Sequence, residues 1–247
     1  QIINTRTGTI SASATGGITG KALGAYGISI QSTASLTTLT NEGSIEAIST
    51  VTDGRGDEAI GVYLKGSTIS TLNNSGSISA SAELESGAGI YVSDESTINT
   101  LTNTGMISGA GTTKAYGIIV VTKSSVGTIT NSGTIVGNQT SSSLDQSSGV
   151  GILISSSSTI NTLTNTGMIS GSATDTGVGV WLYNTSSITT LTNTGTISGL
   201  GITEGGFGIA LTKSSINTLT NTGVISGSTS GGGDGTGANG VWLDLTS

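Results

Sequence analysis

Aliphatic residues recur along the chain in three short patterns separated by glycine, serine and threonine. One pattern is G-[IV]-x-[ILV], as at 89–92 and 179–182; a second is I-x-T-L-T-N, and a third is G-x-I-S-G or a relative. The first alternates with a period of two, which is typical of a β-strand with one buried face. In the second, the interval of three between Ile98 and Leu101 breaks the alternation and predicts a bend. No stretch sustains helical spacing. The pattern predicts three short strands per unit.

These patterns belong to imperfect repeats that cover the whole chain. The phrase T-L-T-N-T-G occurs at 100–105, 162–167, 190–195 and 218–223, and related phrases close the other repeats. The glycines that end the phrases lie 28 to 35 residues apart. A unit this short cannot bury its own apolar face, so neighbouring units must stack. We expect a single domain, 1–247, of about eight stacked coils.

Aligning the repeats places like residues in continuous columns. The two aliphatic residues of the glycine pattern, the Leu of T-L-T and the Ile of G-x-I-S each form one column. Such columns suit the interior of a parallel β-solenoid, because each strand lies about 4.8 Å from the next. Parallel crossovers strongly favour one hand. The sequence therefore predicts a right-handed parallel β-helix, with its length variation in one corner, at 12–26, 46–60, 137–150 and 227–239.

The composition argues against several classes of function and identifies none. The chain has 41 Gly, no Pro, no Cys and no His, and a net charge of −7 with only 7 Lys plus Arg. This balance gives no electrostatic footprint for nucleic acid or anionic lipid. No apolar run is long enough to insert into a bilayer. We expect no cofactor and no thiolate metal site. Both ends fall inside the repeat pattern, which indicates a segment of a longer array or a subunit that stacks end to end.

An asparagine closes the second pattern in most repeats. It shares the parity of the interior leucine two residues before it, so its amide is expected to point inward at a turn. Stacked amides can hydrogen-bond along the axis and satisfy turn backbone groups. We interpret the column as a structural ladder rather than a row of ligand groups. Its members are Asn41, Asn74, Asn103, Asn131, Asn165, Asn193 and Asn221.

Two threonines flank the buried leucine and are expected to face outward. This T-x-T array resembles the threonine rows of insect antifreeze solenoids, and the resemblance implies an ice-binding face. The alternative is that threonine is simply a favourable exposed strand residue. The candidate ice face consists of Thr100, Thr102, Thr128, Thr130, Thr162, Thr164, Thr190, Thr192, Thr218 and Thr220.

Large apolar residues occupy the outward middle position of the glycine pattern. Exposed apolar stripes usually mark an interface. Three interpretations remain open: cover by the long corner loops, lateral packing against another rod, and a platform on which sugars stack. The candidate interaction stripe consists of Tyr63, Tyr91, Ile119, Leu153, Trp181 and Trp242.

Acidic residues gather in two neighbouring loops. Their carboxylates are a weak candidate Ca²⁺ site. No glycine-aspartate calcium repeat is present, and a solvated acidic patch is the favoured interpretation. The residues are Asp53, Asp57, Glu58, Glu83 and Glu85.

Catalysis is not expected. Polysaccharide-degrading β-helix enzymes need carboxylates, or carboxylates with Lys or Arg, that converge on one face of adjacent coils. Here Glu46, Lys65 and Asp244 stand alone on the predicted strands, and no His is available as a base. We predict that the protein is not an enzyme.

The repeated T-L-T-N-T-G-x-I-S-G, with G-[IV]-x-[ILV] in each unit, resembles the passenger regions of bacterial autotransporters and related filamentous adhesins. The resemblance covers essentially the whole chain and concerns architectural positions only. It implies a β-helix exported to the bacterial cell surface by type V secretion, where such passengers mediate adhesion, aggregation or biofilm cohesion. We therefore expect an extracellular structural or adhesive fibre segment that binds copies of itself, laterally or end to end, or a host or neighbouring cell. The alternative is a solenoid that binds ice or a glycan.

Overall fold

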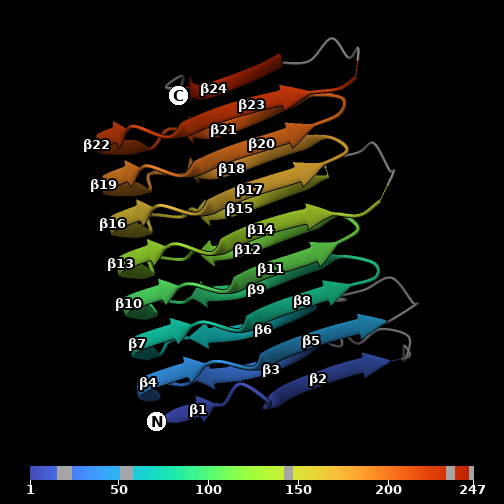
Figure 1. Cartoon of the computed structure of the whole chain (residues 1–247), viewed down its shortest axis with the longest axis vertical. Helices are drawn as coiled ribbons and strands as arrows, with labels where there is room; N and C mark the ends of the chain where they lie inside the picture. The colour runs from blue at the N-terminus through green and yellow to red at the C-terminus, as the bar shows by residue number, and fades with distance from the viewer. Residues whose placement is uncertain (16–23, 51–57, 142–146, 232–236, 245–247) are drawn as a thin grey trace.

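A computed structural model describes residues 1–15, 24–50, 58–141, 147–231 and 237–244. These residues form a stack of coils, each with three strands, and equivalent strands of successive coils pair in parallel (Figure 1). The two termini lie at opposite ends of the stack (Figure 1). The described part of the chain contains strands and no helix. The predicted all-β parallel solenoid with three strands per coil is therefore confirmed, and its right-handed winding remains a prediction.

The strands form three sheets of eight strands each. Sheet A carries the T-L-T-N pattern and consists of β1 (Ile2–Asn4), β4 (Ser35–Asn41), β7 (Thr68–Asn74), β10 (Thr97–Asn103), β13 (Ser125–Asn131), β16 (Thr159–Asn165), β19 (Ser187–Asn193) and β22 (Ser215–Asn221). Sheet B carries the G-x-I-S pattern and consists of β2 (Thr9–Thr15), β5 (Ser44–Thr50), β8 (Ser77–Ala82), β11 (Met106–Gly111), β14 (Thr134–Gln139), β17 (Met168–Ala173), β20 (Thr196–Gly201) and β23 (Val224–Thr229). Sheet C carries the glycine pattern and consists of β3 (Gly24–Gln31), β6 (Glu58–Lys65), β9 (Ser86–Ser93), β12 (Lys114–Val120), β15 (Ser148–Ile154), β18 (Thr176–Tyr183), β21 (Gly205–Thr212) and β24 (Gly237–Asp244).

The predicted aliphatic columns fill the space between the sheets. Ile118, Val120, Ile129 and Ile135 come from one coil, and all four are fully buried. The parallel register of sheet A skips the residue after the first isoleucine, where the sequence predicts a bend. In the last described coil the same columns are more open, and Leu243 is 61% exposed because no described coil covers it. Burial thus depends on the coil above as well as on the sequence of the coil itself.

Sheets B and C approach each other so closely that the recurrent glycine of sheet C admits no side chain. A Cβ atom on Gly117 would lie 2.6 Å from the carbonyl oxygen of Gly151 and 2.6 Å from the Cγ2 atom of Ile135 on sheet B. Contacts this short require the backbone to move. The glycine of the G-[IV]-x-[ILV] pattern is therefore a packing requirement, since a larger residue would separate the two sheets.

The corner between sheets A and B is held by the predicted asparagine ladder. The Nδ2 of Asn131 donates to the Oδ1 of Asn165 at 2.8 Å, and its own Oδ1 accepts from Asn103 at 2.8 Å. The same amide donates to the carbonyls of Gly133 at 3.2 Å and Met168 at 3.1 Å. The amide side chains therefore satisfy turn carbonyls as well as one another. Equivalent bonds link the amides of Asn4, Asn41, Asn74, Asn103, Asn131, Asn165, Asn193 and Asn221.

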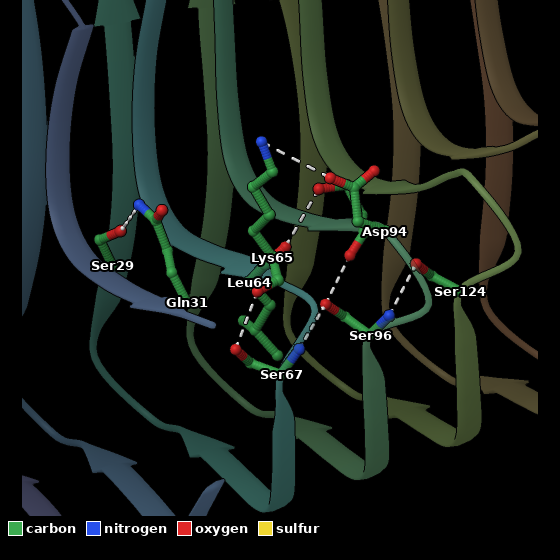
Figure 2. Close-up of polar contacts among 9 residues, drawn as sticks. Ser29, Gln31, Leu64, Lys65, Ser67, Asp94, Ser96 and Ser124 are labelled. Carbon is green, nitrogen blue, oxygen red and sulfur yellow. Dashed lines mark hydrogen bonds and ion pairs between the residues drawn. The ribbon is translucent and has the colours of Figure 1, made fainter. Parts of the chain in front are cut away.

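The corner between sheets C and A contains a second ladder, built from serine, that the sequence did not reveal. The backbone N–H of Ser67 donates to the Oγ of Ser96 at 3.1 Å, and the N–H of Ser96 donates to the Oγ of Ser124 at 3.1 Å (Figure 2). The turn before the ladder uses left-handed backbone conformations, as at Gly66 (φ 59°) and Asp94 (φ 55°). The serine hydroxyls stabilise a turn whose backbone groups lack strand partners.

Candidate functional site

The outer face of sheet C brings the predicted interaction stripe together in one line. Its strands pair in the register Tyr63, Tyr91, Ile119, Leu153 and Trp181, one residue per coil. Trp242 lies further along the same line, beyond an alanine that pairs with Trp181. The structure therefore aligns all six residues of the stripe.

The stripe is only partly open to solvent. Ile119 and Leu153 are each 5% exposed, and they belong to a second apolar cluster on the outside of sheet C. The aromatic residues Tyr91, Trp181 and Tyr183 pack against this cluster and are partly buried. The larger side chains cover the smaller ones, so the face presents aromatic rings over an aliphatic floor. Cover by the long corner segments, one of the three interpretations, stays untested, because residues 16–23, 51–57, 142–146 and 232–236 of these segments lie outside the described residues.

Ring contacts fix the aromatic side chains of this face. Tyr63 lies edge-on to Tyr91, with ring centroids 5.6 Å apart, and Trp181 lies tilted against Tyr183 at 5.5 Å. Burial raises the pKa of Tyr91 to about 12, with a further contribution from the charge of Glu58. Phenols with a raised pKa stay neutral and serve as hydrogen-bond donors and acceptors across the physiological pH range.

Two adjoining cavities open on this face. The first has a volume of about 200 Å³ and the second of about 290 Å³. Both are lined by Lys114, Tyr116, Leu153 and Tyr183. The first extends toward β6 and the second toward β18, so together they form one groove along the stack axis, which we call the sheet C groove. A groove that combines apolar walls with a few polar groups is typical of a ligand site.

Polar side chains follow one edge of the sheet C groove. The parallel register aligns Glu58, Ser86, Lys114, Ser148 and Thr176, one per coil, at the starts of their strands. Each of the five lines at least one of the two cavities. We call this set the polar column. It places hydroxyl, ammonium and carboxylate groups beside the aromatic rings at a spacing of about 4.8 Å.

Buried polar atoms lie beside the groove. Burial raises the pKa of Tyr116 to about 12, and a hydrogen bond with Ser148 partly opposes this effect. Asp175 is 7% exposed and accepts a hydrogen bond from the hydroxyl of Thr203 at 3.3 Å. The indole Nε1 of Trp181 is buried and has no hydrogen-bond partner among the described residues. An unpaired buried donor is costly, so an acceptor that reaches it would be favoured.

The described members of the candidate calcium set, Glu58, Glu83 and Glu85, do not form a group of metal-ligating side chains. Asp53 and Asp57 lie outside the described residues. Glu58 instead accepts a hydrogen bond from the hydroxyl of Tyr26, and its partial burial together with the nearby charge of Glu85 raises its pKa. Glu83 belongs to no group of three or more ligating side chains, and neither do any other described residues. A carboxyl whose pKa is raised is a weaker cation ligand, because it holds its proton more tightly.

The candidate ice face forms two ranks on the outside of sheet A. Thr100, Thr128, Thr162, Thr190 and Thr218 pair in one rank over five coils. The second rank, which consists of Thr102, Thr130, Thr164, Thr192 and Thr220, has the same register. All ten side chains are at least partly exposed. The structure therefore brings the predicted residues into a regular array.

Several residues of the sheet C groove were missed as site residues, among them Lys114, Ser148 and Tyr183. Lys114 and Ser148 begin their strands and Tyr183 ends β18, so none of them lies in a G-[IV]-x-[ILV] pattern. The signal that could have found them is the column of strand-starting residues, where charged and hydroxyl side chains recur four residues before the first interior aliphatic. That column is chemically mixed and does not stand out in an alignment of the repeats.

Comparison with known proteins does not identify a family for this chain. No protein-family model, no curated protein and no solved structure matches the chain significantly. Among the described residues, no helix has the length and apolar character that crossing a membrane requires.

Proposed function

We propose that this protein is an adhesive rod of the bacterial cell surface, and that the outer face of sheet C is its binding face. The observation that carries the proposal is the contrast between faces. Sheet A presents threonine ranks, whereas the outside of sheet C presents a second apolar cluster with partly open aromatic rings and the sheet C groove. A parallel solenoid is rigid along its axis, so such a face is held in a fixed orientation for a partner.

Extracellular location and adhesion are supported by the autotransporter-like repeat T-L-T-N-T-G-x-I-S-G. A chain with no cysteine also suits export through an oxidising compartment, because it cannot form disulfides on the way. We infer a binding role rather than catalysis, since the chain has no histidine to act as a base near neutral pH.

The test is to display the chain on a non-adherent bacterial strain and measure cell aggregation and attachment to surfaces. We expect both to increase relative to cells that carry the empty display anchor. Replacing Tyr91 by Ala should reduce adhesion, because its partly buried ring belongs to the binding face. Met168→Ala is the matched control, because it removes a large side chain, 40% exposed, from the outside of sheet B. Cells that display folded rods and do not adhere would refute the proposal.

A second candidate is ice binding through the threonine ranks of sheet A, favoured by their unbroken register over five coils. Thermal hysteresis measures it directly. We expect a freezing gap that Thr164→Lys at the middle of the second rank abolishes and that Ser170→Lys on sheet B leaves unchanged. Ice growth that the unmodified protein does not affect would eliminate this candidate.

A further inference from the structure

We propose that the sheet C groove binds a linear, neutral glycan that lies along the solenoid axis with about one sugar unit per coil. The inference rests on the adhesive function proposed above and names the ligand of the same face. It is carried by the two adjoining cavities and by the polar column that follows them.

The repeat of the site matches the repeat of a polysaccharide. The groove extends from Glu58 on β6 to Thr176 on β18, which are members of five successive strands. Four steps of about 4.8 Å give a length of about 19 Å. A pyranose unit of an extended polysaccharide has a length similar to this step. Successive sugars would therefore lie over successive coils, although the side chains differ from coil to coil.

The lining of the groove suits the two chemical faces of a sugar. Tyr91 and Tyr183 supply partly exposed rings, and Leu153 supplies an aliphatic floor, for the C–H faces of the pyranose units. Glu58 and Lys114 are exposed at the edge of the groove and can bond hydroxyl groups as acceptor and donor. Each sugar would find an apolar surface and a polar partner in the same coil.

The charges of the groove favour a neutral chain. Glu58 and Lys114 line the same cavity and have opposite charges, and Asp175 lines the adjoining one. The groove therefore has no excess of positive charge to attract a polyanion such as a uronic acid polymer.

The direction of the groove disfavours an extended peptide. The groove runs across the strands, and the backbone groups within sheet C are already paired between neighbouring strands. A peptide strand binds by adding to the open edge of a sheet, which is not available along this face.

The test is direct binding of the full chain to immobilised neutral oligosaccharides of increasing length, with uronic acid oligosaccharides in parallel. We expect affinity for at least one neutral series to rise with length and to level off at about five units, the number of strands along the groove. Tyr183→Ala should weaken binding about tenfold, because it removes a stacking ring that lines both cavities. Lys114→Gln, an exposed change that preserves folding, should weaken it severalfold. Met168→Ala should have no effect.

The outcomes separate this inference from the adhesive function. Displayed rods that aggregate cells without binding any neutral oligosaccharide would overturn the glycan and leave adhesion intact. Binding that Lys114→Gln and Tyr183→Ala do not change would place the ligand elsewhere. Preferential binding of uronic acid chains would refute the neutral ligand. Dimerisation of the chain in solution that Lys114→Gln abolishes, with no glycan binding, would show that a second copy occupies the groove.

Discussion

Replacing Asn131 by Ala removes one rung from the middle of the asparagine ladder. The side chain is fully buried and makes four hydrogen bonds, one from Asn103 and three to Asn165, Gly133 and Met168. The substitution leaves the Oδ1 of Asn165 without its ladder donor in a place that water does not reach. One unsatisfied buried acceptor costs about 2 kcal/mol, and the lost bonds to turn carbonyls add about 1 kcal/mol net. We therefore expect the free energy of unfolding to fall by about 3 kcal/mol.

The measurement is urea-induced unfolding followed by two signals. Circular dichroism reports all the strands, whereas tryptophan fluorescence reports Trp181 and Trp242, which lie on β18 and β24. Coincident transitions permit a single free energy, and separate transitions indicate that the coils around the substitution unfold first. With coincident transitions, the loss of stability is read as a shift in the midpoint at constant slope.

The control is Thr130→Val, which keeps a β-branched residue on the adjacent exposed position and removes only a hydroxyl. We expect a change within about 0.5 kcal/mol. The reasoning fails if Asn131→Ala costs no more than this control, because the ladder would then contribute nothing beyond ordinary strand packing.

Three further predictions concern the scaffold and the groove. Gly117→Ala should destabilise the protein by at least about 2 kcal/mol in urea unfolding, because the new Cβ would lie 2.6 Å from a carbonyl oxygen and an isoleucine methyl. Its control, Gly66→Asn, should be nearly neutral, since other coils place non-glycine residues at that turn with similar φ. Ser124→Ala should cost about 1 to 2 kcal/mol in the same assay, because the serine Oγ accepts a buried backbone N–H. Tyr91 and Tyr116 should ionise near pH 12, above the usual tyrosine pKa of 10.0, when their titration is followed by ultraviolet absorbance. Because the pKa is raised in the folded state, the stability that these two phenols contribute is fully present below pH 10 and is lost as the pH rises toward 12. Titration of both near pH 10 would contradict their burial.

The interior of the protein could be predicted from the sequence more fully than its surface. A residue such as Leu101 returns at a fixed place in every repeat, and parallel stacking converts that regularity directly into a buried column. The asparagine ladder followed for the same reason, because the parity of Asn103 matches that of Leu101. Position along the repeat was sufficient information for both.

The burial of Ile119 and Leu153 could not be predicted in this way. Alternation places both side chains outward, and their exposure depends on whether larger neighbours on other coils lie over them. Tyr183 comes from β18, two strands away from Ile119 on β12, and packs against the apolar cluster that contains Ile119. The serine ladder was hidden for a different reason: serine is abundant throughout the chain, and Ser96 differs from its neighbours only in the turn geometry around it.

The difference between the two outer faces follows from how a parallel stack repeats its surface. Any outward position recurs about every 4.8 Å along the axis, so each face is suited to a ligand that itself has a repeating structure. The sheet A ranks repeat threonine without change, and such a face has no preferred position along the rod. The groove on sheet C changes at each coil, from Tyr91 to Ile119 to Leu153 to Trp181, and its polar column changes sign between Glu58 and Lys114. A face with the same residue on every coil can bind a lattice at any position along the rod. A face whose side chains differ from coil to coil favours one position for a single bound chain. We therefore assign the proposed selective recognition to sheet C rather than to sheet A.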